Sequence, residues 1–257
     1  MSLSINPINR RSRPARARYS VFACALALLL SPLFCAAQTS PPDLEQTRAV
    51  IAQMRAPMRS VPLDVVIEAL YGHKVLPFNH GNRNHAEVLK RLDVAAVSVI
   101  AKIKAEGGIS SKRVNEVGNT IEQYVRDALT AQGMPARVPT TKKSGRARAV
   151  GYPDVTFTFK GEHFYLDCKT YNKETANTTM RTFYLSPSDD PKISRDAVHL
   201  ILSFETARKG DVYQLASYKI VSLEKLSLDL KYEFNSDNRR MYSGKDGAEI
   251  LAGAVCK

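Results

Sequence analysis

The pattern of apolar and polar positions predicts helices in the first half of the chain and strands in the second. Apolar residues recur at helical spacing in three stretches, Leu44 to Met54, Val61 to Tyr71 and Ala86 to Ala105. Residues that interrupt helices separate these stretches, at Pro57, Pro62, Pro77 and Gly81. We therefore expect residues 38–108 to form an α-helical N-terminal region.

A further helix is predicted from Ser111 to Gln132. Ser110 or Ser111 is suited to cap its N-terminus, and Gly133 with Pro135 supplies a stop signal. Its apolar stripe consists of Val114, Val117, Ile121, Tyr124, Val125 and Leu129. The stripe indicates a helix that packs one face against a core.

Two short strands joined by a turn are predicted between Gly151 and Tyr171. In both strands apolar residues alternate with polar ones, which is typical of half-buried strands. The apolar positions are Val155, Phe157 and Phe159 in the first strand and Phe164, Leu166 and Cys168 in the second. Lys160-Gly161-Glu162 supplies the turn.

The polar face of this hairpin carries ionisable residues suited to a divalent metal ion. Asp167 and Lys169 must share a face because side chains alternate along a strand, and Asp154 can lie opposite them. Two carboxylates are a common ligand set for Mg²⁺, which keeps several waters. Lys169 beside them can orient or deprotonate an attacking water, or stabilise the charge of a phosphoryl transition state.

Further strands are predicted downstream of the hairpin. Val198 to Glu205 is a nearly continuous apolar run, as in a central strand covered on both faces. The segment before it is rich in Thr, Ser, Asp and Pro, which indicates a loop with at most a short helix. Val212 to Tyr232 suggests additional strands, and Arg239-Arg240 a basic turn.

Pro153-Asp154, followed one hairpin later by Asp167-Cys168-Lys169, resembles the signature of the PD-(D/E)xK nuclease superfamily. That superfamily includes most type II restriction endonucleases. The resemblance covers roughly Val114 to Thr206 and implies an α/β, restriction-endonuclease-like core, with a mixed central sheet flanked by helices. It also implies that Asp154 and Asp167 are metal ligands and that Lys169 is the catalytic lysine.

A helix upstream of the hairpin often carries a glutamate near the metal in this superfamily. Glu122, one turn after Gly118, fits that place best and would be a third metal ligand. Glu116 is the reserve candidate, since it lies on a different face of the helix. The alternative is that both are solvated residues of the helix surface.

The charge of the chain favours a polyanionic partner. It has 37 Lys+Arg against 25 Asp+Glu, a net charge of +12. Without the first 37 residues, which hold five arginines and no acid, 32 basic residues remain and the net charge is +7. The expected phosphate contacts to double-stranded DNA flank the motif, at Lys142, Lys143, Arg146, Arg148, Lys173 and Arg181, with Lys192 and Arg195 as further cations. A flexible basic loop is the alternative for the first four.

Residues 1–37 have the composition of a secretory signal peptide. An arginine-rich start precedes a short apolar run that ends in small residues, with cleavage expected after Ala37. No stable membrane anchor is expected if the signal is cleaved, although tethering is the alternative. A second alternative is that the gene model begins too far upstream and that the true start is Met54 or Met58. The mature protein would then be cytoplasmic rather than periplasmic or secreted.

The polar segment from Asn79 to His85 contains two histidines in an N-H-G-N-R-N-H arrangement. The spacing is too compressed for an HNH-type nuclease, so we expect a polar loop between helices. The four cysteines show no spacing typical of a zinc site or a disulfide framework.

Taken together, these features predict three parts: a signal peptide or mis-assigned start over residues 1–37, the helical region over 38–108, and a nuclease domain over 109–257. The expected function is Mg²⁺-dependent hydrolysis of DNA, most simply by a type II restriction endonuclease that acts as a homodimer without an organic cofactor. The alternatives are an exported or repair-type non-specific nuclease, and a non-catalytic exported binding protein that keeps the fold.

Overall fold

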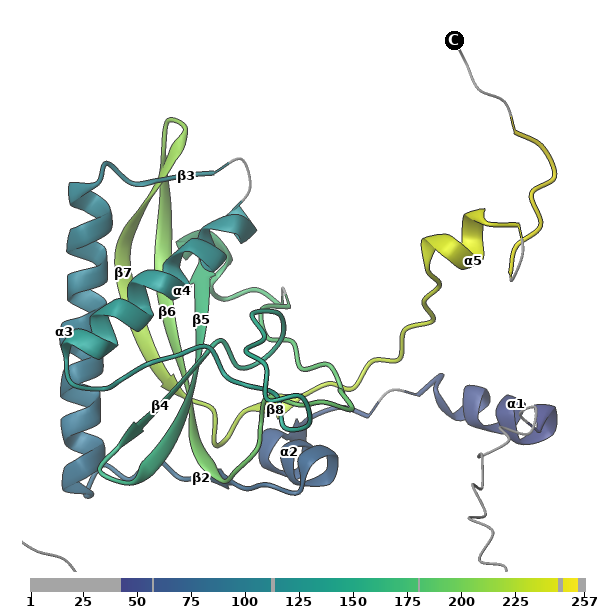
Figure 1. Cartoon of the computed structure of the whole chain (residues 1–257), viewed down its shortest axis with the longest axis horizontal. Coiled ribbons are helices and arrows are strands. Elements are labelled where there is room, and N and C mark those ends of the chain that lie inside the picture. Colours follow the sequence, from purple (N-terminus) through teal and green to yellow (C-terminus); the bar gives the residue numbers. More distant parts are fainter. Residues whose placement is uncertain (1–42, 57, 112–113, 180, 245–246, 254–257) are drawn as a thin grey trace, which may run out of the picture. The chain divides into compact units, whose positions relative to one another are not determined.

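The structure is a computed structural model that describes residues 43–56, 58–111, 114–179, 181–244 and 247–253 (Figure 1). The signal peptide expected over residues 1–37 lies outside these ranges and stays a prediction. Within the described ranges, no helix is both long enough and apolar enough to cross a lipid bilayer.

A mixed β-sheet forms the centre of the fold (Figure 1). Its strands follow the order β3 (Ile109–Ser110), β7 (Val212–Ser222), β6 (Ala197–Lys209), β5 (Glu162–Tyr171) and β4 (Val155–Phe159), with β2 (Val75–Leu76) paired to the start of β6. β5 and β2 each run parallel to β6, whereas the other pairs are antiparallel. A separate two-stranded pair joins β1 (Val61–Pro62) to β8 (Ser227–Leu228).

The predicted hairpin is present as β4 and β5. Val155 pairs with Leu166 and Phe159 with Glu162, which leaves a two-residue turn. Lys160 and Gly161 in that turn both have positive φ, at 47° and 82°. Positive φ at both central residues is the geometry of turns that match the right-handed twist of a hairpin. The register of this hairpin fixes which side chains share a face.

Helices α3 (Arg83–Ala105) and α4 (Val114–Ala131) cover one face of the sheet. α3 packs against β7 and against α4, and α4 packs against β5 (Figure 1). Their apolar stripes meet the inward side chains of the strands in one core, which includes Val88, Leu92, Val99, Val117, Ile121, Val125, Phe157, Phe164, Leu166, Leu200, Leu202 and Phe204. The predicted α/β core with a mixed sheet flanked by helices is therefore confirmed.

The opposite face of the sheet is covered only in part. α2 (Leu63–Tyr71) buries Leu63 and Ile67 against Tyr165 of β5, together with Ile193 and Leu223 from nearby loops. Farther along the same face, Lys169 and Tyr171 keep partial exposure to solvent. This face therefore changes from an aromatic core to an open surface along a single strand.

Two predicted segments differ in detail from the structure. β6 runs to Lys209, because its pairing with β7 continues past an irregularity between Glu205 and Thr206. Arg239 and Arg240 lie in a short helix, α5 (Asn238–Tyr242), and not in a turn, because the Asp237 side chain caps that helix through the N–H of Arg240 at 2.8 Å.

The region expected to be helical also contains the short strands β1 and β2. The β5–β6 connection contains a single short helical turn, η1 (Lys173–Thr175), among its described residues. α1 (Leu44–Gln53) is helical and buries none of its side chains. The helical region 38–108 supplies α3 to the same core as α4, and its division from residues 109–257 stays a prediction.

Candidate active site

Asp154 comes directly before β4, and a backbone group of β5 holds its carboxylate. Its Oδ2 accepts a hydrogen bond from the N–H of Cys168 at 2.8 Å. Since Cys168 lies between Asp167 and Lys169, this bond holds the Asp154 carboxylate beside the same short stretch of β5.

Asp167 and Lys169 lie on the face of β5 opposite to the α3–α4 core. Asp167 is 2% exposed and the Lys169 side chain is 23% exposed. Lys169 Nζ forms an ion pair with Asp167 Oδ2. The hairpin therefore brings Asp154, Asp167 and Lys169 together at the point where the covered part of this face ends.

The electrostatics of the site reflect two crowded carboxylates. Burial, and then the neighbouring Asp154, raise the pKa of Asp167 to about 7, although Lys169 acts in the opposite direction. Burial alone would lower the pKa of Lys169, but Asp167 and Asp154 raise it above its ordinary value. A cation placed between the two carboxylates would relieve their mutual repulsion.

Glu122 approaches the same site from α4. Burial and the Asp154 carboxylate raise its pKa, while Arg126, Lys192 and Lys169 lower it. Its Oε2 lies 3.6 Å from Arg126 Nη1, and both side chains are 16% exposed. Glu122 is therefore within electrostatic reach of Asp154, but it is paired with an arginine that the sequence pattern did not single out.

The carboxylate pair fits a divalent cation. Asp167 Oδ2 is buried and, apart from its ion pair with Lys169, accepts no hydrogen bond within the described structure. Carboxylate oxygens are hard ligands, and Mg²⁺ is commonly held by one or two of them with several waters. Among the described residues, no group of three or more His, Cys, Asp or Glu is arranged to hold a metal ion. Asp154 and Asp167 are thus the two carboxylates that the geometry brings together.

Lys192 is a second lysine at this site, and the sequence pattern placed it only among surface cations. It is 5% exposed, and its Nζ donates hydrogen bonds to the carbonyl oxygens of Pro153 and Ala149. Burial lowers its pKa, whereas Asp154, Glu122 and Asp167 raise it. A buried lysine in a loop rich in Ser, Asp and Pro has no local sequence signature.

Aromatic residues line the covered side of the site. Tyr152 Oη and His199 Nδ1 lie 2.6 Å apart, and Tyr165 packs edge-on against the His199 ring. Burial, followed by Asp167, raises the pKa of Tyr152 well above its ordinary value. Burial lowers the pKa of His199 to about 4, so both groups are neutral at pH 7. These two buried groups therefore add no charge beside the carboxylates.

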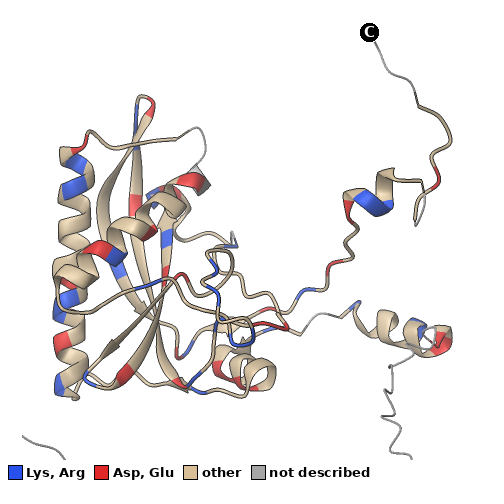
Figure 2. Ribbon diagram, viewed as in Figure 1, with Lys and Arg blue, Asp and Glu red and all other residues tan. Residues whose placement is uncertain are grey.

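The predicted DNA-contacting residues occupy two loops beside the site. Lys142, Lys143, Arg146 and Arg148 are exposed on a loop whose backbone is bonded to the β5–β6 connection, where Lys142 N–H donates to Pro191 O at 2.9 Å. Lys and Arg residues of both segments are blue in Figure 2.

Lys173 and Arg181 both lie on the β5–β6 connection. Lys173 is exposed in η1. Arg181 is committed to other contacts, since Nη1 lies 3.4 Å from Glu233 Oε1 and its guanidinium stacks over Tyr184.

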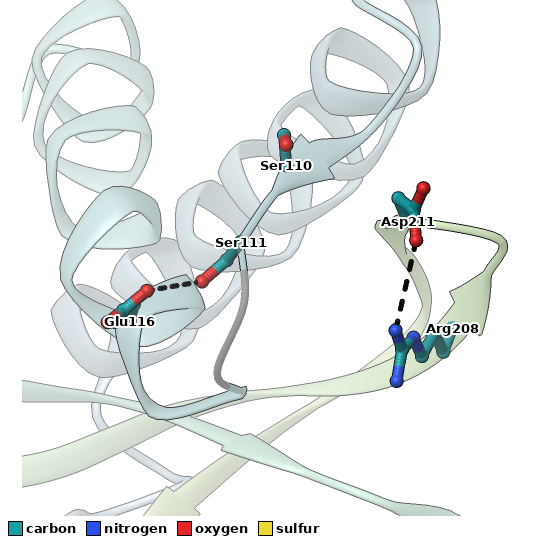
Figure 3. Close-up of a pocket in the computed structure, with 5 residues that line it drawn as sticks. All are labelled: Ser110, Ser111, Glu116, Arg208 and Asp211. Atoms are coloured by element: carbon teal, nitrogen blue, oxygen red, sulfur yellow. Dashed lines mark hydrogen bonds and ion pairs between the residues drawn. The ribbon is translucent and has the colours of Figure 1, made fainter.

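Glu116, the reserve glutamate, lies in a different pocket (Figure 3). That pocket has a volume of about 600 Å³ and is lined by residues of β3, the start of α4 and the β6–β7 hairpin. Ser111 Oγ donates a hydrogen bond to Glu116 Oε2 at 2.8 Å, and Arg208 pairs with Asp211 at 4.0 Å (Figure 3). Asp154, Asp167 and Lys169 do not line this pocket.

The segment from Asn79 to His85 is a polar loop that leads into α3. Asn82 caps the helix through the N–H of Asn84 at 2.8 Å. His85 is buried, accepts a hydrogen bond from Asn79 N–H through Nδ1, and contacts Glu162 of β5 through Nε2 at 2.7 Å. His85 therefore joins the loop to the β4–β5 hairpin.

Comparison with known proteins gives the site its context. Residues 57–245 match the family model of the type II restriction enzyme MjaV family. The type II restriction enzyme MjaV of Methanocaldococcus jannaschii is 38% identical over 213 residues, which cover 77% of this chain and 92% of that protein. Neither match supports a non-specific nuclease or a binding protein without catalysis.

Type II restriction enzymes act on DNA and generally use divalent metal ions. The resemblance stated from Pro153-Asp154 and Asp167-Cys168-Lys169 is confirmed at the level of a restriction-endonuclease-like protein. The chain belongs to the type II restriction enzyme MjaV family and is an endodeoxyribonuclease.

Proposed function

We propose that this chain is a Mg²⁺-dependent type II restriction endonuclease that hydrolyses phosphodiester bonds of double-stranded DNA at Asp154, Asp167 and Lys169. The observation that carries this proposal is the buried Asp167 carboxylate, placed by the hairpin beside Asp154 and paired with Lys169. Membership of a restriction enzyme family supplies the substrate class.

Asp154 and Asp167 would hold the metal ion, with Glu122 near enough to act electrostatically or through a water. When bound, Mg²⁺ would neutralise charge that develops on the phosphate and lower the pKa of a coordinated water. The role of the protein is to keep the two carboxylates close in a partly dry site, where their mutual repulsion favours a divalent cation.

Lys169 would stabilise the negative charge of the reacting phosphate. Its ammonium is partly exposed beside the carboxylates, on the open side of the site. Because Asp167 and Asp154 raise its pKa, the lysine is protonated at neutral pH and suits charge stabilisation better than proton abstraction. This choice was left open by the sequence.

The DNA backbone would pass over the loop that carries Lys142, Lys143, Arg146 and Arg148. These side chains are exposed, and the backbone of their loop is fixed to the β5–β6 connection next to the carboxylates. Phosphate contacts of this kind set the register of a protein on DNA without reading its sequence. A homodimer would place two such sites on the two strands of a two-fold recognition site.

A plasmid cleavage assay tests the proposal. The wild-type protein should give discrete fragments with Mg²⁺ and none with EDTA. Asp154→Ala and Lys169→Ala should each reduce cleavage by at least about 10²–10³-fold. Asp127→Ala and Lys225→Ala, both at exposed positions, serve as matched controls that should cut normally. Normal cutting by the Asp154 or Lys169 variant would show that the site is elsewhere, and a smear of products would exclude sequence specificity.

A further inference from the structure

We propose that Lys192 is a positioning residue for the metal site, which acts by fixing the backbone that carries Asp154. The inference rests on the proposed function, because it takes Asp154 as a metal ligand. It assigns a role to a residue of the β5–β6 connection that lies far from the hairpin motif in the sequence.

The contacts of Lys192 are with the backbone next to Asp154. Its Nζ donates to the carbonyl oxygen of Pro153, the residue directly before Asp154, and to that of Ala149 at 3.5 Å. The ammonium thus bridges two carbonyls of the segment that leads into β4. The Asp154 carboxylate itself accepts a hydrogen bond from the N–H of Cys168. Together these contacts fix both the main chain and the side chain of one ligand.

Lys192 is itself held firmly in place. Asp190 accepts hydrogen bonds from the backbone N–H groups of Lys143 at 2.6 Å and Ser144 at 3.3 Å, and Pro191 O accepts one from Lys142. Beyond Lys192, Ile193 is buried in the aromatic core and Ser194 N–H donates to Tyr165 Oη at 3.0 Å. The tripeptide Asp190-Pro191-Lys192 therefore connects the basic loop to the backbone of the carboxylate site.

The burial of Lys192 favours a positioning role over direct contact with a DNA phosphate. Its side chain is directed into the protein, with 5% of the residue exposed, whereas Lys169 keeps 23% of its side chain exposed. Two of the three ammonium donors are used by carbonyls, and burial keeps the remaining one away from a DNA phosphate at the protein surface. Groups that orient metal ligands from outside the ligand set typically change metal affinity or activity 10–100-fold when they are removed.

The test compares Lys192→Met, Lys192→Arg and the exposed-lysine control Lys90→Met with the wild-type protein. Mg²⁺ affinity is measured by titration calorimetry on the DNA-free chain, and cleavage is resolved into kcat and the KM for DNA. We expect Lys192→Met to bind Mg²⁺ at least about tenfold more weakly and to lose kcat with little change in KM. Lys192→Arg, which keeps the charge and the donors, should recover most of both values, and Lys90→Met should equal wild type.

Coulombic repulsion between the Lys192 ammonium and Mg²⁺, taken alone, predicts a change of metal affinity with the opposite sign. Removing a positive charge near the carboxylates would strengthen Mg²⁺ binding if Lys192 did not also position Asp154. Unchanged or tighter binding by folded Lys192→Met would therefore overturn the proposal, and so would a raised KM with unchanged metal affinity. If Lys192→Met does not fold, Lys192→Ala replaces it, because alanine also lacks a side-chain donor, and wild-type Mg²⁺ affinity in that variant would equally overturn the proposal.

Measurements on the wild-type protein distinguish a failure of the proposed function from a failure of the role proposed for Lys192. If wild type neither binds a divalent metal nor cuts DNA, the proposed function fails and the role of Lys192 fails with it. If wild type does both and Lys192→Met behaves identically, only the role of Lys192 is rejected.

Discussion

The two faces of strand β5 differ sharply although their residues alternate along the same ten positions. Phe164, Leu166 and Cys168 point into the core beneath α3 and α4. Tyr165, Asp167 and Lys169 point to the other face, where an aromatic cluster gives way to the carboxylate site. One face contributes buried apolar area, and the other holds the ion pair of buried Asp167 with partly exposed Lys169, to which we assign the chemistry.

The comparison shows how a small hairpin can tolerate an unfavourable site. Buried carboxylates that repel one another cost stability, because each must lose water without a full set of partners. The apolar face of the same strand offsets that cost, since each fully buried aliphatic or aromatic side chain contributes about 1.5–3 kcal/mol. Stability and activity should therefore separate by face, even between neighbouring residues.

The adjacent residues Leu166 and Asp167 give the strongest test of this separation. Asp167→Asn should lower cleavage by about 10²–10³-fold or more, while the free energy of unfolding stays level or rises at pH 8. Leu166→Ala should lower the free energy of unfolding by about 2–5 kcal/mol and leave cleavage per folded molecule largely unchanged. Denaturant melts and single-turnover cleavage at low temperature measure both. A large loss of unfolding free energy in Asp167→Asn would contradict the separation of stability and activity between the two faces of β5.

The pH dependence of stability sharpens the same contrast. Asp167 has a pKa near 3.8 when unfolded and about 7 in the folded protein, so between those values the folded state alone retains its proton. The stabilisation from this group is complete below about pH 4 and is lost as pH rises through 7, on the order of 2–4 kcal/mol. In EDTA, wild type should therefore lose unfolding free energy relative to Asp167→Asn as the pH rises from about 4 to 7, and the difference should level off above that.

Two histidines, His163 and His199, the first half-buried and the second fully buried, make the variant comparison necessary. Burial lowers the pKa of both His163 and His199 to about 4, which removes stability as pH falls below 6.5. Both histidines are present in wild type and in Asp167→Asn, so their contribution cancels in the difference. Parallel pH curves for the two proteins would mean that Asp167 ionises normally.

The smallest expected effect concerns the basic loop, which belongs to neither face. Lys142→Ala with Lys143→Ala should weaken DNA binding about tenfold and reduce the salt slope by about 1–2, with kcat at saturating DNA unchanged. Binding is measured at several salt concentrations, with Lys225→Ala as the control at an exposed position. An unchanged salt dependence of DNA binding would show that the DNA backbone does not contact this loop. A lower kcat would show that the loop also affects the reaction at the carboxylate site.

The hairpin and its polar face could be predicted because all the relevant information is local. Alternation over β4 and β5 fixes which residues share a face, and the two-residue turn fixes which residues of the two strands lie opposite each other. The helices were also predictable from their stripes. That α3 and α4 pack side by side over one face was not, since periodicity shows which face is buried but not against what.

Residues that act through tertiary contacts escaped prediction. The local sequence around Lys192 predicts a surface cation. Lys192 is buried only because its loop packs against the backbone at Pro153. Arg126 is one turn from Glu122 and could have been paired with it from helical spacing. The Tyr152–His199 contact joins residues distant in sequence, for which a single sequence offers no signal.

The parallel pairing of β5 and β6 has a consequence for how the enzyme forms. The hairpin that carries Asp154, Asp167 and Lys169 closes over a two-residue turn and can form on its own early in folding. β6 can dock only after the connection of residues 172–196 has closed, which is entropically more demanding. We therefore expect the hairpin to bring the carboxylates together first, and the backbone beside Asp154 to be fixed later, when Lys192 reaches the carbonyl of Pro153.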